Sequence, residues 1–115
     1  MEGASQLSDT AKVLFRDPGN EVFMSSISAW EIAIKYSLGR LPLPDEPRLF
    51  VPEQRKAHDI DMLSLDEAAA LHLIKLPALH NDPFDRMLVC QSIVHGMTIL
   101  TPDKLISAYP AQTIW

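Results

Sequence analysis

Residues 80–96 read HNDPFDRMLVCQSIVHG and place two aspartates, three residues apart, at the start of an apolar run. Asp82 directly precedes a proline, and proline is well tolerated at the first position of a helix, where its missing N–H would have no partner anyway. A short polar side chain before that proline can accept hydrogen bonds from the first backbone N–H groups. The stretch therefore predicts a helix that begins at Pro83, carries Asp85 in its first turn and stops at Gly96.

Apolar periodicity and turn signals on either side of this helix predict that strands and helices alternate along the chain. The predicted strands are residues 21–25, 60–64, 97–101 and 112–115; the other predicted helices are 6–16, 28–38, 53–59, 65–75 and 102–108; residues 40–52, with four prolines, are expected to form a loop or at most a broken helical turn. Alternation of this kind predicts an α/β layer fold with a mainly parallel sheet. A chain of 115 residues suits one domain that spans residues 1–115.

Two of these helices are expected to begin with a capping box, a serine followed three residues later by a glutamate. In the first, Ser28 is the expected N-cap and Glu31 the third helical residue. The second pairs Ser64 with Glu67. Gly39 is the expected stop of the first of these helices, because glycine readily adopts the left-handed conformation that ends many helices.

The composition is that of an ordinary globular protein, with 47% hydrophobic and 22% charged residues. A formal net charge of -5 gives no general attraction for nucleic acid. A nuclease with an acidic metal site could still have this negative net charge. No apolar run is long enough to cross a membrane, and a cytoplasmic protein is expected. The lone cysteine, Cys90, lies in the apolar run and is expected to pack in the core.

Three acidic residues fall where helices begin after predicted strands or, for one of them, after a loop: Glu31, Asp85 and Asp103. In a parallel sheet, ligands bind beyond the carboxyl ends of the strands, at the starts of the following helices. Carboxylate oxygens are the ligands that Mg²⁺ and Mn²⁺ prefer. If the three acids converge, they could hold such an ion for phosphodiester hydrolysis.

Each of these acids also has a purely structural interpretation. Glu31 can complete a capping box, Asp82 can cap its helix, and Asp85 and Asp103 can interact with helix dipoles. The four histidines show no spacing typical of a metal motif. Spacing alone leaves both interpretations open.

Three stretches resemble PIN-domain proteins, specifically the VapC-like toxins of bacterial toxin–antitoxin pairs. They are EVFMSSISAWEIAIKYSLGRLPLP at 21–44, HNDPFDRMLVCQSIVHGMTILTPD at 80–103 and YPAQTIW at 109–115. The resemblance implies a PIN-like three-layer α/β/α fold. It also implies a ribonuclease that uses Mg²⁺ or Mn²⁺ to cleave RNA and is inhibited by a cognate antitoxin protein.

By position in these motifs, the resemblance implies that three acids bind the metal: Glu31 of WEIAIK, Asp85 of DPFDR and Asp103 of TPD. Asp82 is the neighbour of Asp85 in its motif and is expected to cap the helix. The opening pair of aspartates is thus expected to divide its roles: Asp82 starts the helix and Asp85 binds the metal.

The chain departs from the family at its beginning. PIN domains normally start with a strand of the type LLDTH, whose aspartate is a further metal ligand, and here MEGAS stands in that place. The first strand is therefore expected to be missing, through a truncated gene, a misplaced start or a shortened form. Loss of a central strand would expose strand edges, so a homo-oligomer is expected.

Two functions from different classes follow. The first is a metal-dependent endoribonuclease of the VapC toxin type, expected to be weak or inactive without the fourth carboxylate. The second is a non-catalytic PIN-fold module that binds an antitoxin or associates with itself. Retention of Glu31, Asp85 and Asp103 favours the first, and the absent aspartate favours the second.

Overall fold

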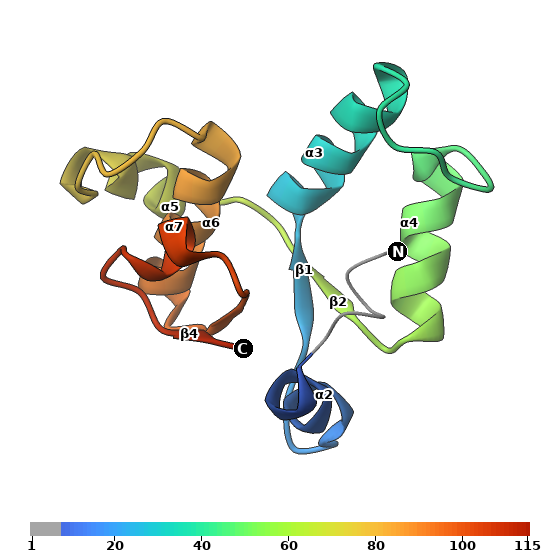
Figure 1. The fold of residues 1–115 in the computed structure, drawn as a ribbon, viewed down its shortest axis with the longest axis horizontal. Coiled ribbons are helices and arrows are strands. Elements are labelled where there is room, and N and C mark those ends of the chain that lie inside the picture. The colour runs from blue at the N-terminus through green and yellow to red at the C-terminus, as the bar shows by residue number, and fades with distance from the viewer. Residues whose placement is uncertain (1–7) are drawn as a thin grey trace. The chain divides into compact units, whose positions relative to one another are not determined.

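The computed structural model describes residues 8–115 and confirms the alternation of helices with short strands (Figure 1). In chain order the elements are α2 (Asp9–Arg16), β1 (Phe23–Ser25), α3 (Ser26–Ser37), α4 (Pro47–Ala57), β2 (Asp61–Leu63), α5 (Glu67–Leu71), the 3₁₀ helix η1 (His72–Lys75), α6 (Pro83–His95), β3 (Ile99–Leu100), α7 (Lys104–Ser107) and β4 (Thr113–Ile114). The first two residues of the helix predicted at 6–16 lie outside the described residues.

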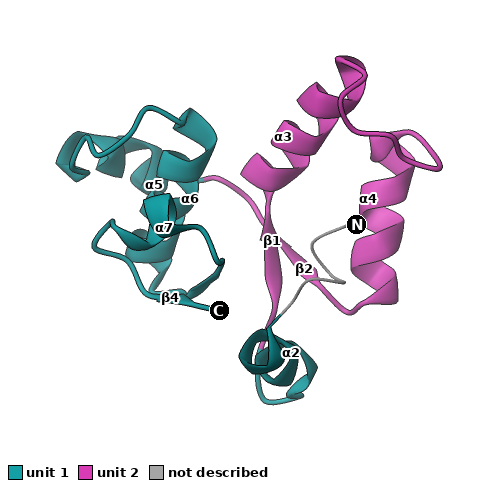
Figure 2. Ribbon diagram, viewed as in Figure 1, with its two compact units in different colours: residues 1–20, 66–115 teal, residues 21–65 magenta. Residues whose placement is uncertain are grey.

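The chain divides into two compact units (Figure 2). Residues 21–65 form unit 2, and unit 1 consists of residues 1–20 together with 66–115. The prediction of a single domain over residues 1–115 stays a prediction.

Unit 2 is built on the parallel pair of β1 and β2, in which Phe23 lies opposite Asp61 and Ser25 opposite Leu63. Helices α3 and α4 form the connection between these strands, as parallel pairing requires. Its buried apolar side chains come from both helices: Ile27, Ile32 and Val51.

The start of α3 differs from the predicted capping box. Ser25, at the end of β1, is the N-cap, and its hydroxyl accepts a hydrogen bond of 3.0 Å from the N–H of Ile27. Ser28 lies inside the first turn, and Glu31 lies one turn further on. The predicted end is correct: Gly39 is left-handed at φ 71, and the N–H of Arg40 donates to the carbonyl of Lys35 over 2.9 Å. This closure is a Schellman motif.

The prediction of a loop at residues 40–52 is wrong in its second half. Helix α4 begins at Pro47, where the fixed φ of proline suits a first helical position. It then continues through Pro52, although a proline inside a helix removes one backbone hydrogen bond. Val51, only 8% exposed, anchors this part of α4 in the apolar interior of unit 2. Packing of that face therefore outweighs the break that Pro52 alone would predict.

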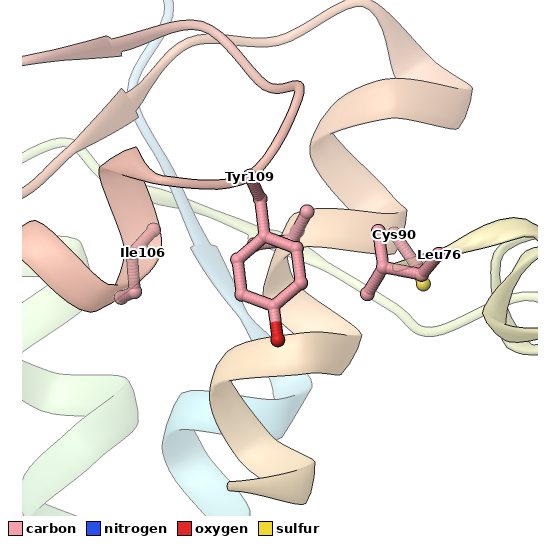
Figure 3. Close-up of a cluster of buried hydrophobic side chains, with 5 residues drawn as sticks. Leu76, Cys90, Ile106 and Tyr109 are labelled. Carbon is pink, nitrogen blue, oxygen red and sulfur yellow. The ribbon is translucent and has the colours of Figure 1, made fainter. Parts of the chain in front are cut away.

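Unit 1 contains the second parallel pair, in which Ile99 of β3 lies opposite Thr113 of β4. The apolar core of the unit includes the buried face of α6 (Figure 3). Its buried members are Leu76, Val89, Cys90, Ile106 and Tyr109. Cys90 is fully buried, as predicted, and burial raises the pKa of its thiol.

The predicted limits of α6 are confirmed at both ends. Asp82 is the N-cap, Pro83 is the first helical residue, and Gly96 is left-handed at φ 64. The start of α5 is a correction, because its N-cap is Asp66 instead of Ser64. One carboxylate oxygen of Asp66 accepts from the N–H of Ala69 over 2.9 Å, and the other lies 2.8 Å from Nε2 of His95.

Helix α2 is capped by Ser8, whose hydroxyl accepts a 3.0 Å hydrogen bond from the N–H of Ala11. The residues that follow form a turn, in which the N–H of Gly19 donates to the carboxylate of Asp17. Both strand pairs of the described residues are parallel, which agrees with the predicted α/β class. Within residues 8–115, no helix is long and apolar enough to cross a membrane.

Candidate active site

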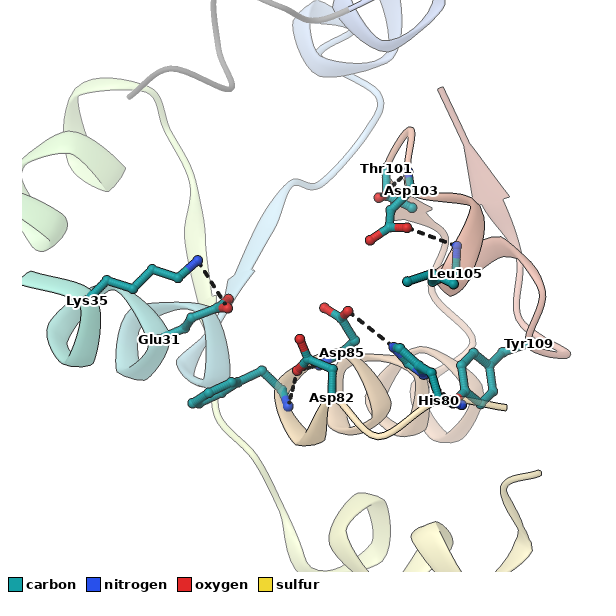
Figure 4. Close-up of polar contacts among 10 residues, drawn as sticks. Glu31, Lys35, His80, Asp82, Asp85, Thr101, Asp103, Leu105 and Tyr109 are labelled. Carbon is teal, nitrogen blue, oxygen red and sulfur yellow. Dashed lines mark hydrogen bonds and ion pairs between the residues drawn. The ribbon is translucent and has the colours of Figure 1, made fainter. Parts of the chain in front are cut away.

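The two aspartates at the start of α6 have different roles, as the sequence predicted for Asp82. Its carboxylate accepts hydrogen bonds from the N–H groups of Phe84 (2.9 Å) and Asp85 (3.1 Å). These are backbone donors of the first helical turn that have no partner within the helix. Asp82 is therefore engaged in starting α6. Asp85, the third helical residue, makes no capping bond and directs its carboxylate elsewhere (Figure 4).

The Asp85 side chain is only 18% exposed and lies next to the ring of His80, with 3.3 Å between Oδ2 and Nε2. Burial raises the pKa of the Asp85 carboxyl, while the hydrogen bond from His80 opposes this change. The negative charges of Asp82 and Asp103 raise that pKa further. Asp85 is thus a partly desolvated carboxylate among like charges, an environment in which a bound cation would be stabilising.

His80 connects Asp85 to the core of unit 1 through Tyr109 (Figure 4). The Tyr109 hydroxyl lies 2.6 Å from Nδ1 of His80 and also accepts the His80 backbone N–H over 3.2 Å. The sequence analysis missed both residues. The only local signal was the position of His80, two residues before Asp82, because the partner tyrosine is 29 residues away along the chain.

Asp103 follows β3 and is the N-cap of α7, with its carboxylate 2.9 Å from the N–H of Leu105. The N–H of Asp103 itself donates to the Thr101 hydroxyl over 3.1 Å. Asp103 lies near enough to Asp85 for its charge to raise the Asp85 pKa. Unit 1 therefore brings two of the three predicted metal ligands into one electrostatic neighbourhood.

Glu31, the third predicted ligand, lies on α3 in unit 2 and forms an ion pair with Lys35, with 3.3 Å between Oε2 and Nζ. The Glu31 side chain is 28% exposed and Lys35 is 54% exposed. The expectation that Glu31 lies in the first turn is wrong, because α3 begins earlier than predicted. The convergence of Glu31 with Asp85 and Asp103 stays a prediction.

Within residues 8–115, no group of three or more His, Cys, Asp or Glu side chains is arranged to hold a metal ion. The carboxylates of Asp85 and Asp103 nevertheless have the hard oxygen ligands that suit Mg²⁺ or Mn²⁺. The surroundings of Asp85 also fit a divalent cation: burial raises the pKa of its carboxyl, the charges of Asp82 and Asp103 raise that pKa further, and a cation would offset this repulsion.

Residues 3–111 match the family model described as the PIN domain. The chain belongs to the PIN domain family. This membership confirms the resemblance found in the sequence and the α/β class of the fold. PIN domains have a three-layer α/β/α architecture.

One curated relative of this PIN domain is Ribonuclease VapC16 of Mycobacterium tuberculosis (strain ATCC 25618 / H37Rv). The two proteins are 35% identical over 69 residues, which is 60% of this chain and 49% of the relative. The chain thus spans about half the length of the curated relative that it matches. The similarity supports a VapC-like PIN domain.

Proposed function

We propose that this PIN domain is a metal-dependent endoribonuclease of the VapC toxin type, with RNA as its substrate and Mg²⁺ or Mn²⁺ as its cofactor. The observation that carries the proposal is the state of Asp85. It is a partly buried carboxylate whose pKa is raised by burial and by the charges of Asp82 and Asp103. Perturbed acids of this kind cluster at functional sites. The matched family and the VapC16 relative support the same reaction class.

In this proposal Glu31, Asp85 and Asp103 hold the ion, and Asp82 keeps its structural role as a helix cap. A bound divalent cation supplies charge neutralisation at the phosphodiester and activation of water. The chain contributes the placement of the oxygen ligands. Asp85 is fixed at the third position of α6 by the Asp82 cap, and Asp103 by the start of α7.

The metal site is tested by thermal unfolding of the purified chain with and without Mn²⁺ or Mg²⁺. A cation that binds the folded state raises Tm with its concentration. We expect this increase to be much smaller in Asp85→Asn and in Asp103→Asn, and reduced in Glu31→Gln. An increase of equal size in the wild type and Asp85→Asn would contradict the proposed site.

Two variants serve as matched controls. Asp66→Asn removes an acid of unit 1 that caps α5, and asparagine keeps the capping ability. Lys35→Ala removes the ion-pair partner of Glu31 without removing the carboxylate. Both should retain the metal-dependent increase in Tm. Any metal-dependent cleavage of RNA by the wild type should likewise disappear in Asp85→Asn and persist in Asp66→Asn.

A second proposed function, binding of an antitoxin or of another copy of this chain, is favoured by exposed apolar side chains near the end of α5. Ile74 is 87% exposed and Leu71 is 60% exposed. Contiguous apolar patches mark protein interfaces, and these two side chains are three residues apart in consecutive helical turns. We expect a homo-oligomer by light scattering at micromolar concentration, converted towards monomer by Ile74→Glu. A wild-type monomer would contradict self-association.

A further inference from the structure

The hydrogen bonds around His80 form a continuous chain from the core of unit 1 to the candidate metal ligand. Tyr109 is 3% exposed and belongs to the apolar core cluster, so its ring is fixed by packing. Its hydroxyl contacts both the backbone and the ring of His80. The opposite edge of that ring contacts Asp85. The chain therefore runs from Tyr109 through His80 to Asp85.

For a neutral imidazole, the donors and acceptors of this chain define which ring nitrogen of His80 carries the proton. The Tyr109 oxygen accepts the backbone N–H of His80, and its own O–H remains to be donated. Donation of that O–H to Nδ1, 2.6 Å away, leaves a neutral ring with its proton on Nε2. The Nε2–H group then donates to Oδ2 of Asp85 over 3.3 Å. With a neutral ring and an ionised Asp85, every contact is satisfied in this arrangement, which is an assignment made from the network.

The contacts of His80 differ from ordinary polar contacts at a protein surface, because they are largely buried. The His80 side chain is 14% exposed and its ring lies 5.3 Å from that of Tyr109, centroid to centroid, at an interplanar angle of 55°. His80 is therefore held on one side by an aromatic ring and on the other by its bond to Asp85. A carboxylate bonded to a ring that is itself fixed has few orientations open to it.

We propose that Tyr109 and His80 are positioning residues that fix the orientation of the Asp85 carboxylate for divalent-cation binding. This inference rests on the proposed function, because it takes Asp85 as a metal ligand. Neither residue contacts the cation in this proposal: Tyr109 selects the His80 tautomer, and the tautomer presents a donor to Asp85. Partners that orient a ligating residue typically affect metal affinity about 10- to 100-fold.

The test measures Mn²⁺ affinity by calorimetry, and the His80 tautomer by ¹⁵N NMR of the metal-free chain. Tyr109→Phe keeps the ring in the core but removes the hydroxyl. We expect it to weaken Mn²⁺ binding about tenfold and to remove the preference for Nε2–H. His80→Ala should weaken binding at least as much, and His80→Gln, which can still offer a side-chain N–H to Asp85, should restore part of the affinity.

The matched control is His95→Gln, which alters the other His–Asp pair of unit 1, whose Nε2 lies 2.8 Å from Asp66. It should leave the Mn²⁺ affinity unchanged. A purely structural role for Tyr109 and His80 would lower Tm without changing the affinity of the folded protein for Mn²⁺. The tautomer of the wild type is measured without metal and without any variant, so it remains informative if a variant folds poorly.

The outcomes separate this inference from the proposed function. If Asp85→Asn loses Mn²⁺ binding but Tyr109→Phe and His80→Ala bind like the wild type, Asp85 is a ligand and the positioning role is overturned. A wild-type ring with its proton on Nδ1 would overturn it as well. If the wild type does not bind Mn²⁺, or Asp85→Asn binds it unchanged, the proposed site and the inference both fail.

Discussion

Helices α3 and α6 begin and end by the same rules, yet their acidic residues have different surroundings. Each is capped by a short polar side chain, Ser25 or Asp82, and each is followed by a left-handed glycine. Glu31 of α3 has a lysine partner one turn away, which neutralises its charge. Asp85 of α6 contacts a histidine ring and lies close to further carboxylates. Capping thus explains where the two helices begin and end. The charge environment of each acid depends instead on the side chains around it.

The largest effect within this comparison is expected at the two glycines. Gly96→Ala and Gly39→Ala each force a side chain into the left-handed region, at a cost of about 1–2 kcal/mol in the free energy of unfolding. A Cβ at either position would have no heavy atom within 4 Å, so the cost comes from the backbone alone. Denaturant unfolding measures it. Changes below about 0.5 kcal/mol would show that the glycine conformation does not determine these helix ends.

The next effect concerns the N-caps and distinguishes the observed start of α3 from the one the sequence suggested. Ser25→Ala should destabilise the chain by about 1 kcal/mol, because it removes the acceptor for the Ile27 N–H. Ser28→Ala, inside the helix, should change the stability by less than about 0.5 kcal/mol. Asp82→Ala should resemble Ser25→Ala. A greater loss in Ser28→Ala than in Ser25→Ala would restore the predicted capping box.

The smallest effects are expected at the acids themselves, and they have opposite signs. Glu31→Gln removes an i,i+4 ion pair and should cost about 0.2–0.5 kcal/mol. Asp85→Asn should slightly raise Tm without metal at pH 7, because it removes a charge that the fold disfavours. Thermal unfolding of both variants without divalent cations measures the difference. A clear loss of stability in Asp85→Asn would contradict the proposed crowding of charge.

The pH dependence gives an independent check on Asp85. The pKa of the Asp85 carboxyl is raised in the folded state from the ordinary value of 3.8. The folded chain therefore keeps the carboxyl proton of Asp85 to a higher pH than the unfolded chain does. The wild type should therefore lose stability relative to Asp85→Asn as the pH rises from about 3.8 through the folded pKa. Above that window the difference should stay constant. A difference in Tm that does not vary with pH would contradict this.

Sequence patterns predicted the limits of α6 better than those of the other helices, for a physical reason. Asp82 and Pro83 agree on one start, and Gly96 marks one end. At α3, by contrast, more than one serine can serve as an N-cap, and the end of β1 selects Ser25. Local capping signals cannot decide between neighbouring serines when the position of the preceding strand makes the choice.

At helix α4 the error came from applying the rule that proline breaks helices too strictly. The prolines of residues 40–52 suggested a loop, but Pro47 starts the helix and Pro52 is accommodated within it. Tertiary packing of Val51 is not visible in a pattern dominated by helix-breaking residues.

For the candidate site, chain order identified Asp85 and Asp103 as acids near helix starts, and the structure places their charges in one neighbourhood. The contribution of His80 could not be predicted from spacing, because its role depends on Tyr109, far along the chain. Residues that contact a candidate ligand through tertiary structure leave no periodic signal in the sequence. Their identification required the packed core of unit 1.

The complete burial of Cys90 gives the chain an internal reporter of its own breathing motions. Its thiol lies in the core cluster on α6 and has a raised pKa, so it should not react with alkylating reagents while the helix is packed. Labelling then requires a transient opening of α6, and the labelling rate under native conditions reports the free energy of that opening. The helix that carries Asp85 can therefore be followed without adding a probe, and a cation that binds to this helix should slow the reaction.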